Sequence, residues 1–320
     1  MAKMNKRVYG VIGIASRMAN WNADFTGRPK TCSDGTIFGS DKALKYSMKR
    51  LWVSQGEKVL YFKSYILNQK GAEKNKIQPK ELAERYNELF DTEISDKTSS
   101  QEVLGNLFST IDVLNFGATF AVKKQNIGLT GIVQIGQGFN KYEDSLVEVQ
   151  DILSPFRNSA KEEADASSLG KKVVSNEAHY FYPFSVNPNH YDEFTRLLPD
   201  FEGYTEEAYL KFKEAALVGA TALNTNSKAG CENEFALFVT CKEGENLYLP
   251  HLDTYIDFRK DERNLIDITR VEEVLSAAAD RIETVEVFYN PYTTDIYTTA
   301  GFLSKEGWTR KNIFTRTKVE

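Results

Sequence analysis

Two neighbouring stretches decide how this fold begins: VYGVIGIASRMANWNADFTGRPK (residues 8–30) and SDKALKYSMKRLW (residues 40–52). Residues 8–15 are apolar at successive positions, which predicts a central strand covered on both faces. Residues 16–39 are rich in Asn, Asp, Gly and Pro and predict a long loop. Ser40 is a good N-cap for a helix that follows. A strand, a polar loop and a basic helix in succession form a surface that can hold a phosphate backbone.

The predicted helix has two distinct faces. Three apolar residues recur at helical spacing and should face the core: Leu44, Met48 and Leu51. Three basic residues recur on another face and predict a stripe exposed to solvent: Lys42, Lys45 and Lys49.

Charge is distributed unevenly along the chain. Residues 1–63 carry twelve Lys or Arg and four acidic residues, a net charge of +8, whereas the whole chain carries −5. The remainder is therefore −13. Because a polyanion responds to the local field, this asymmetry predicts one defined basic face that binds nucleic acid without coating it nonspecifically.

Composition excludes several other classes of protein. The chain has 320 residues, 41% of them hydrophobic, and can bury a sizeable core. No apolar run approaches the roughly 20 residues of a membrane span, and the N-terminus does not resemble a signal peptide, so we expect a cytoplasmic protein with no membrane partner. The three cysteines and three histidines show no metal-ligand spacing and no disulfide framework. We expect no metal and no cofactor.

Apolar patterns predict the remaining elements. We expect strands at 59–67, 111–122, 128–139, 179–186, 233–241 and 284–288, and helices at 79–90, 205–223 and 268–282. The strands 111–122 and 128–139 should form a hairpin, and Pro183 predicts an edge or a bulge in its strand. Without a polar insertion and a charged arm, the order is strand, helix, strand, strand, helix, strand. This order predicts an α+β fold with a ferredoxin-like, RRM-like βαββαβ core.

A set of sequence blocks resembles a known family. In chain order they are ANWNADFTGRPK, DKALKYSMKR, DVLNFGATFAV, GIVQIGQG, ILSPFRN, HYFYPFSVNPNHY and ALNTNSKAGCENE, spread between about residues 8 and 241. Together they are similar to the backbone subunit of type I CRISPR surveillance complexes, closest to the I-B branch. Many relatives have Arg in the third block where this chain has Leu114, so that position is no cationic contact here.

The resemblance implies a non-catalytic protein that polymerises along a CRISPR RNA and presents it for pairing with target DNA. Its implied partners are the CRISPR RNA, target DNA through the guide, other copies of itself head to tail, and other subunits of the complex. It also implies a single elaborated domain shaped like a hand. The expected parts are a palm at about 5–54, 108–139 and 178–245, a helical insertion at 55–107, a protruding thumb loop at 141–177 and a C-terminal extension at 246–320.

A protein that accepts any guide should contact phosphate and sugar rather than base edges. The resemblance places RNA contacts in the loop and the basic helix, with Lys45 and Lys49 favoured: Arg17, Asn20, Asn22, Arg28, Lys42, Lys45, Lys49 and Arg50. Further polar contacts are expected at Asn115, Gln134 and Gln137. In the thumb, Phe156 or Leu169 is the expected wedge between bases, with Arg157, Lys171 and Lys172 on phosphates.

Two alternatives of other classes stay open. Related type III backbone proteins cut RNA with an aspartate in the early loop, where this chain has Asp24 and Asp34. A metal-dependent endoribonuclease would ordinarily need clustered carboxylates, and neither aspartate lies in a clear acidic cluster. The second alternative is a protein-interaction scaffold that uses the acidic remainder of the chain.

Overall fold

The computed structural model describes residues 2–69, 74–153 and 169–319. Its architecture is α+β, and the described residues include a nine-stranded sheet with the order β16-β14-β11-β1-β10-β8-β2, in which β7 and β9 also pair with β10. The strands of this sheet are β1 (Val8–Ala19), β2 (Phe38–Gly39), β7 (Val133–Ile135), β8 (Gly138–Asn140), β9 (Val147–Leu153), β10 (Leu169–Val186), β11 (Cys231–Cys241), β14 (Ile282–Tyr289) and β16 (Trp308–Asn312). Smaller sheets contain β3 (Tyr65–Leu67) with β4 (Ile77–Pro79), β5 (Gly117–Val122) with β6 (Gln125–Thr130), and β12 (Asp257–Lys260) with β13 (Asn264–Asp267) and β15 (Thr294–Tyr297).

The prediction of a central first strand is confirmed. Strand β1 pairs antiparallel with β10 on one side and β11 on the other, so that Val11 stands opposite both Pro183 and Leu237. Both faces of β1 are buried, because Ile12 belongs to one hydrophobic cluster and Val11 to another. A continuous apolar run is what this double burial requires.

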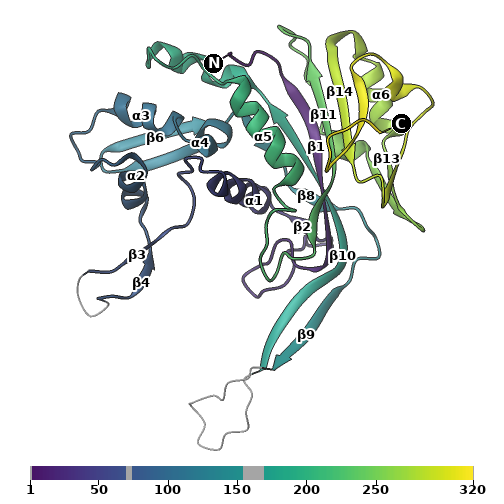
Figure 1. The fold of residues 1–320 in the computed structure, drawn as a ribbon, viewed down its shortest axis with the longest axis horizontal. Coiled ribbons are helices and arrows are strands. Elements are labelled where there is room, and N and C mark those ends of the chain that lie inside the picture. Colours follow the sequence, from purple (N-terminus) through teal and green to yellow (C-terminus); the bar gives the residue numbers. More distant parts are fainter. Residues whose placement is uncertain (1, 70–73, 154–168, 320) are drawn as a thin grey trace, which may run out of the picture.

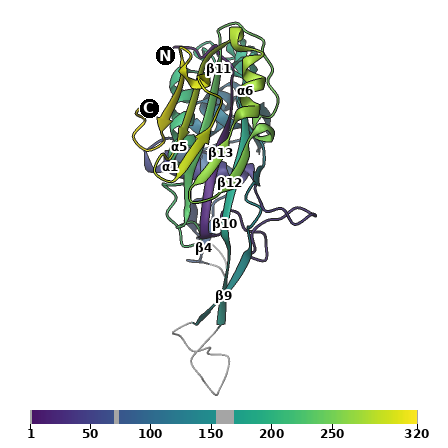
Figure 2. The same ribbon diagram turned by 90° about the vertical axis from the view of Figure 1, so that its right-hand side faces the viewer.

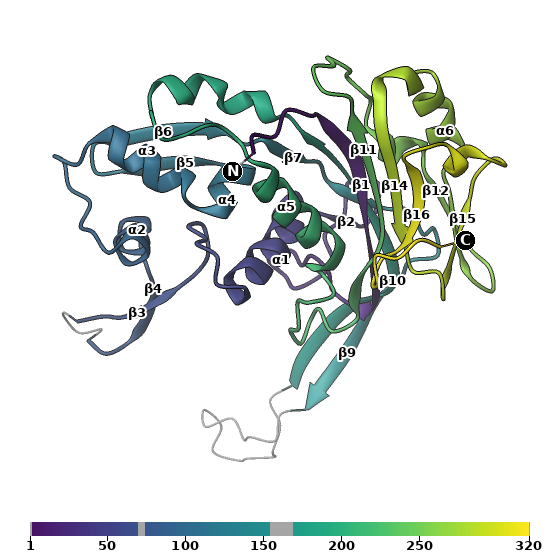
Figure 3. The same ribbon diagram turned by 45° about the horizontal axis from the view of Figure 1, so that its top comes forward.

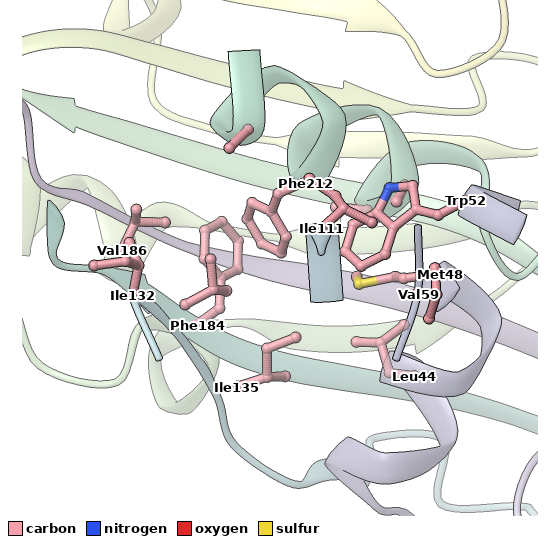
Figure 4. Packing of buried hydrophobic residues seen from close by; sticks show 14 of the residues in the cluster. Leu44, Met48, Trp52, Val59, Ile111, Ile132, Ile135, Phe184, Val186 and Phe212 are labelled. Atoms are coloured by element: carbon pink, nitrogen blue, oxygen red, sulfur yellow. The ribbon is translucent and has the colours of Figure 1, made fainter. Parts of the chain in front are cut away.

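Helices α1 and α5 lie over one face of the sheet (Figure 1). The α-helices are α1 (Asp41–Ser54), α2 (Leu82–Phe90), α3 (Ser100–Phe108), α4 (Ile111–Phe116), α5 (Glu206–Val218) and α6 (Thr269–Ser276). Short 3-10 helices occur at Pro188–Arg196, Leu252–Tyr255, Ala279–Arg281 and Phe302–Ser304. Ser40 caps α1 as predicted by accepting from the Ala43 amide at 3.4 Å. Leu44 and Met48 are buried in one cluster with Phe184 and Phe212 (Figure 4).

The opposite face of the sheet is covered by the C-terminal part of the chain. Val11, Phe181 and Phe235 form a second hydrophobic cluster with Phe258 of β12 and Leu275 of α6. Figure 2 shows β12, β13 and α6 in front of the sheet. The same part of the chain also extends the sheet, because β14 pairs with β11. Among the described residues, no helix has the length and apolar character needed to cross a membrane.

The predicted strand 111–122 is wrong in its first half. Residues Ile111–Phe116 form α4, and the chain then enters β5 at Gly117, whose φ of 75° is strained for other residues. A Cβ on Gly117 would meet the Leu129 carbonyl oxygen at 2.2 Å. The predicted partner strand 128–139 divides into β6, β7 and β8, and the hairpin of β5 and β6 forms a sheet of its own.

Two predicted elements of the insertion begin later than expected. Only Tyr65–Leu67 of the predicted strand 59–67 is a strand, because the amides of Leu60 and Tyr61 donate to the Asp112 carboxylate at 2.8 and 2.9 Å. The predicted helix 79–90 begins at Leu82, where Glu81 forms a capping box with Glu84. Pro79 instead ends β4.

Of the two alternatives predicted for Pro183, the edge is wrong, since β10 lies between β1 and the strands β7 and β8. An irregularity is present, however, because the register of β10 shifts by one residue between its pairing with β8 and its pairing with β7. Gly136, which links β7 and β8, donates its amide to the Pro183 carbonyl oxygen at 2.8 Å. In an antiparallel strand the N–H and the C=O of one residue point to the same side. The N–H that Pro183 lacks would therefore point toward the segment around Gly136, where β7 has ended and β8 has not yet begun. No regular ladder hydrogen bond is lost there.

The arm predicted as a loop is, where described, a β-ribbon. Strands β9 and β10 pair from Val147 with Ser175 to Leu153 with Leu169. The ribbon projects beyond the sheet as a continuation of β10 (Figure 1). The helix predicted at 205–223 and the strand predicted at 233–241 are confirmed as α5 and β11, with shifted ends. The helix predicted at 268–282 is shorter, since β14 already begins at Ile282.

Candidate nucleic-acid interface

The elements that carry most of the predicted RNA contacts lie on one side of the molecule. The ribbon of β9 and β10 and the hairpin of β3 and β4 project in the same general direction, and α1 lies between their bases (Figures 1 and 3). Two of the hydrogen bonds that hold the loop after β1 to this framework come from the side chains of Trp21 and Asn22. Trp21 Nε1 donates to Tyr182 Oη at 2.5 Å, and Asn22 Oδ1 accepts from the Ser40 amide at 2.8 Å.

The predicted contacts at the start of the loop are occupied within the protein. Asn20 is 3% exposed, and its side-chain amide donates to the carbonyl oxygens of Gly27 and Val173 at 3.0 and 3.1 Å. Lys228 donates to the Asn20 carbonyl oxygen. Asn20 and Asn22 therefore shape the loop in this conformation, whereas the Arg28 side chain is exposed.

Arg17 is part of an ionic network at the base of the ribbon. Its guanidinium lies 3.3 Å from Glu177 and 3.2 Å from Glu232. Fully buried His179 contacts Glu177 at 3.1 Å through Nε2 and Glu234 at 2.8 Å through Nδ1. Burial opposes protonation, but the two carboxylates prevail and raise the pKa of His179 to about 9. This network joins β1, β10 and β11.

The three lysines of α1 do not share one solvent face, so the predicted exposed stripe is wrong. Lys42 is exposed, but Lys45 Nζ lies 3.0 Å from Asp41, and its side chain is only 19% exposed. Lys49 Nζ lies 3.4 Å from the buried carboxylate of Asp112. Burial lowers the pKa of Lys49, and Asp112 offsets part of this effect. Each of the two lysines directly follows a core residue of α1, which explains its partial burial.

Several cations on this side make no ion pair with any described residue. They are Arg28, Lys42, Arg50, Lys63, Lys171 and Lys172. Of these, Lys63 was missed by the sequence prediction, although it falls within the basic first 63 residues. The aromatic residues close to it in the sequence, Phe62 and Tyr65, could have indicated Lys63 as a candidate RNA contact, because nucleic-acid-binding surfaces combine cations with aromatic rings.

The predicted polar contacts from the middle of the chain differ in their environment. Asn115 is fully buried, because its segment is helical, and it bonds to the Ile111 carbonyl oxygen at 2.9 Å and to Tyr204 Oη at 2.6 Å. Its amide is thus a core group here. Gln134 and Gln137 are exposed, and Gln137 Nε2 donates to Asp41 Oδ1 at 3.3 Å, beside the start of α1.

Only some of the RNA contacts predicted in the thumb belong to the described residues. Phe156 and Arg157 lie outside the described residues. The backbone of Leu169 pairs with Leu153 at the end of the described ribbon. Lys171 is exposed and Lys172 half-buried on β10. RNA contact by all of these residues stays a prediction.

The two aspartates considered for RNA cleavage have local structural roles. Asp24 Oδ1 accepts from the amides of Thr26 and Arg28 at 2.8 and 3.0 Å. Asp34 Oδ1 accepts from the Thr36 amide at 2.9 Å. Hydrogen bonds of this kind lower the pKa of both carboxyl groups. Among the described residues, no three His, Cys, Asp or Glu side chains gather as a metal site.

Sequence reasoning did not identify Asp112, which contacts Lys49, one of the predicted RNA contacts. Its carboxylate holds two backbone amides and Lys49, yet its segment was interpreted as a strand, in which its partners could not be foreseen. The hydrogen bond between Trp21 and Tyr182 was also missed, because the two residues are distant in sequence and no local pattern pairs them.

Comparison with known proteins agrees with this architecture. One solved structure, a CRISPR RNA-guided surveillance complex, pre-nicking, contains a chain similar to this one with a TM-score of 0.51 and 14% identity, over 92% of this chain and 96% of that chain. A chain of another CRISPR RNA-guided surveillance complex is similar with a TM-score of 0.50 and 13% identity, over 91% and 94%. At this identity the likeness shows the fold alone. No curated protein matches the chain. The family described as CRISPR-associated protein Cas7 matches residues 6–277, and the chain therefore belongs to the Cas7 family.

Proposed function

We propose that this chain is a guide-RNA-binding backbone subunit of a type I CRISPR surveillance complex, of the I-B kind. The observation that carries the proposal is the Cas7 family match over residues 6–277. The two similar chains come from CRISPR RNA-guided surveillance complexes, which supports CRISPR RNA and other subunits as partners. In this proposal the RRM-like palm consists of the strands in the order β11-β1-β10, with β7 and β8 beyond β10, together with α1 and α5, and the observed strand order supports it.

The covered sheet supports a backbone-directed mode of RNA binding. Many RNA-recognition modules stack bases on the open face of their sheet. Here that face carries Phe181 and Phe235, which are buried under the C-terminal part of the chain. RNA instead lies along α1, the loop after β1 and the ribbon, where unpaired cations are available for phosphates. Phosphate contacts carry no sequence information, as a protein that accepts any guide requires.

In this function the protein holds RNA and does not cut it. Copies stack head to tail along the guide, the thumb reaches over the neighbouring RNA segment, and the exposed bases pair with target DNA. The basic first 63 residues and the acidic remainder support such a heterologous contact between copies.

The direct test is to express the chain with its neighbouring genes and a CRISPR array, purify the assembly at high salt, and sequence the bound nucleic acid. We expect RNA of uniform guide length in a multi-copy assembly. Protein that elutes without RNA would overturn the proposal. RNA that is bound and then shortened in a metal-dependent manner, and left intact by an Asp34→Ala variant, would establish the nuclease instead.

A further inference from the structure

A groove with a volume of about 480 Å³ lies between α1, the segment after α1 and the loop after α5. Its lining includes Tyr46 and Arg50 of α1, Phe62 and Lys63 of the segment after α1, and Asn224 and Thr225 of the loop after α5. Only Arg50 in this set was predicted as an RNA contact. The groove is distinct from the ion-paired side of α1 that carries Lys45 and Lys49.

The aromatic residues of this groove form a platform that reaches solvent. The rings of Tyr46 and Phe62 are stacked, with centroids 5.7 Å apart and an angle of 11° between their planes. Tyr46 remains 45% exposed, although a large aromatic side chain usually avoids water. Tyr65, also on the groove, is 56% exposed. The platform can therefore accept a further flat ring.

The groove is also positively charged. Arg50 lies 6.0 Å from the centroid of the Phe62 ring, and Lys63 lies 5.1 Å from that of Tyr65. Neither cation forms an ion pair with a described residue. The described residues that line the groove include no Asp or Glu, although the chain carries a net charge of −5. Stacked aromatic rings flanked by unpaired cations suit a single-stranded nucleic acid, which presents both flat bases and phosphates.

We propose that this groove binds single-stranded RNA, with an unpaired base stacked on Tyr46 and the adjacent phosphates at Arg50 and Lys63. The inference rests on the proposed function and adds a base-stacking site to it. Stacking tolerates any sequence, because every base has a flat π face. Duplex RNA has no free face to offer, so the groove prefers a single strand.

The experiment measures how tightly the chain of residues 1–320 binds a fluorescent single-stranded RNA at several salt concentrations. Tyr46→Ala should weaken binding about tenfold without changing the dependence on salt, because stacking releases no counterions. Tyr46→Phe should bind like the wild type. Arg50→Ala with Lys63→Ala should lower the slope of log K against log salt by about one to two. Tyr292→Ala, which removes another exposed tyrosine, is the matched control.

The outcomes separate this inference from the proposed function. If the wild type binds RNA but Tyr46→Ala and Tyr292→Ala bind equally well, the groove is not a stacking site while the proposed function stands. The inference would also be overturned if Tyr46→Ala weakened the binding of duplex RNA as much as it weakens the binding of single-stranded RNA. A wild type that binds no RNA would refute the proposed function itself. Equal urea unfolding midpoints for the variants show that each remains folded.

Discussion

Lys49 Nζ lies 3.4 Å from Asp112 Oδ2, so a lysine predicted to contact RNA also pairs with a buried carboxylate of the protein itself. Asp112 also accepts the amides of Leu60 and Tyr61, and Lys49 donates to the Tyr61 carbonyl oxygen at 3.3 Å. The pair therefore joins α1, α4 and the segment between α1 and β3. Lys49 thus differs from Lys42 of the same helix, whose side chain is exposed.

Replacing Lys49 should lower stability. Lys49→Ala leaves the Asp112 carboxylate buried without its cation, and we expect the free energy of unfolding to fall by about 3 kcal/mol. Lys42→Ala on the same helix is the control, since its side chain is exposed and should change stability by less than about 0.5 kcal/mol. Urea unfolding checks both. Superimposable curves for Lys49→Ala and the wild type would show that the pair contributes nothing.

The unpaired cations should set the salt dependence of RNA binding. Replacing Arg28 and Lys42 together with Ala should lower the slope of log K against log salt by about one to two, because each phosphate contact with a single strand contributes about 0.7. The double variant Lys242→Ala, Lys318→Ala removes the same charge from exposed positions elsewhere and should leave the slope unchanged. Fluorescence anisotropy at several salt concentrations distinguishes them. A slope unchanged in both would exclude Arg28 and Lys42 from the interface.

The ionic network around His179 should make stability depend on pH. The pKa of His179 is raised from 6.5 to about 9, so its stabilising contribution is complete below pH 6.5 and is lost as the pH rises through 9. The bond to His179 helps to lower the pKa of Glu177 from 4.5 to about 2, so this second contribution is complete above pH 4.5 and is lost as the pH falls through 2. The two effects leave a plateau between about pH 4.5 and 6.5.

The alkaline part of this profile can be assigned to His179. In His179→Gln the fall in unfolding free energy between pH 6.5 and 9 should largely disappear. His251→Gln, which replaces an exposed histidine, should retain it. Urea midpoints across this range provide the measurement, and an equal fall in both variants would show that another group titrates.

A glycine beside the loop anchor should tolerate no side chain. A Cβ on Gly39 would meet Tyr182 Oη at 1.8 Å and the Trp21 ring at 2.7 Å. We expect Gly39→Ala to break the bond between these residues and to lower stability by about 2 kcal/mol. Gly105 in α3 has open space around its Cβ position, so Gly105→Ala should raise stability by about 0.5 to 1 kcal/mol. Thermal unfolding that ranks the two variants in the opposite order would contradict this account.

Sequence patterns correctly predicted the elements that depend on residues close to one another in the chain. The continuous apolar run of β1, the Ser40 cap and the spacing of Leu44 and Met48 all describe their own surroundings, and the structure confirms them. The pattern failed at 111–116, where alternating apolar residues suggested a strand. There Asp112 and Gly117 determine the backbone through partners that are distant in sequence.

The sequence by itself determined the α+β class, the central first strand, the capped basic helix and the basic character of the first 63 residues. Only the tertiary structure decided which cations remain available, since Lys45 and Lys49 form ion pairs within the protein whereas Lys42, Arg50 and Lys63 form none with the residues that the structure describes. It also decided that the second face of the sheet is covered by the C-terminal part of the chain. The physical reason is that propensity and periodicity act over a few residues, whereas ion pairing and burial depend on which distant segments meet.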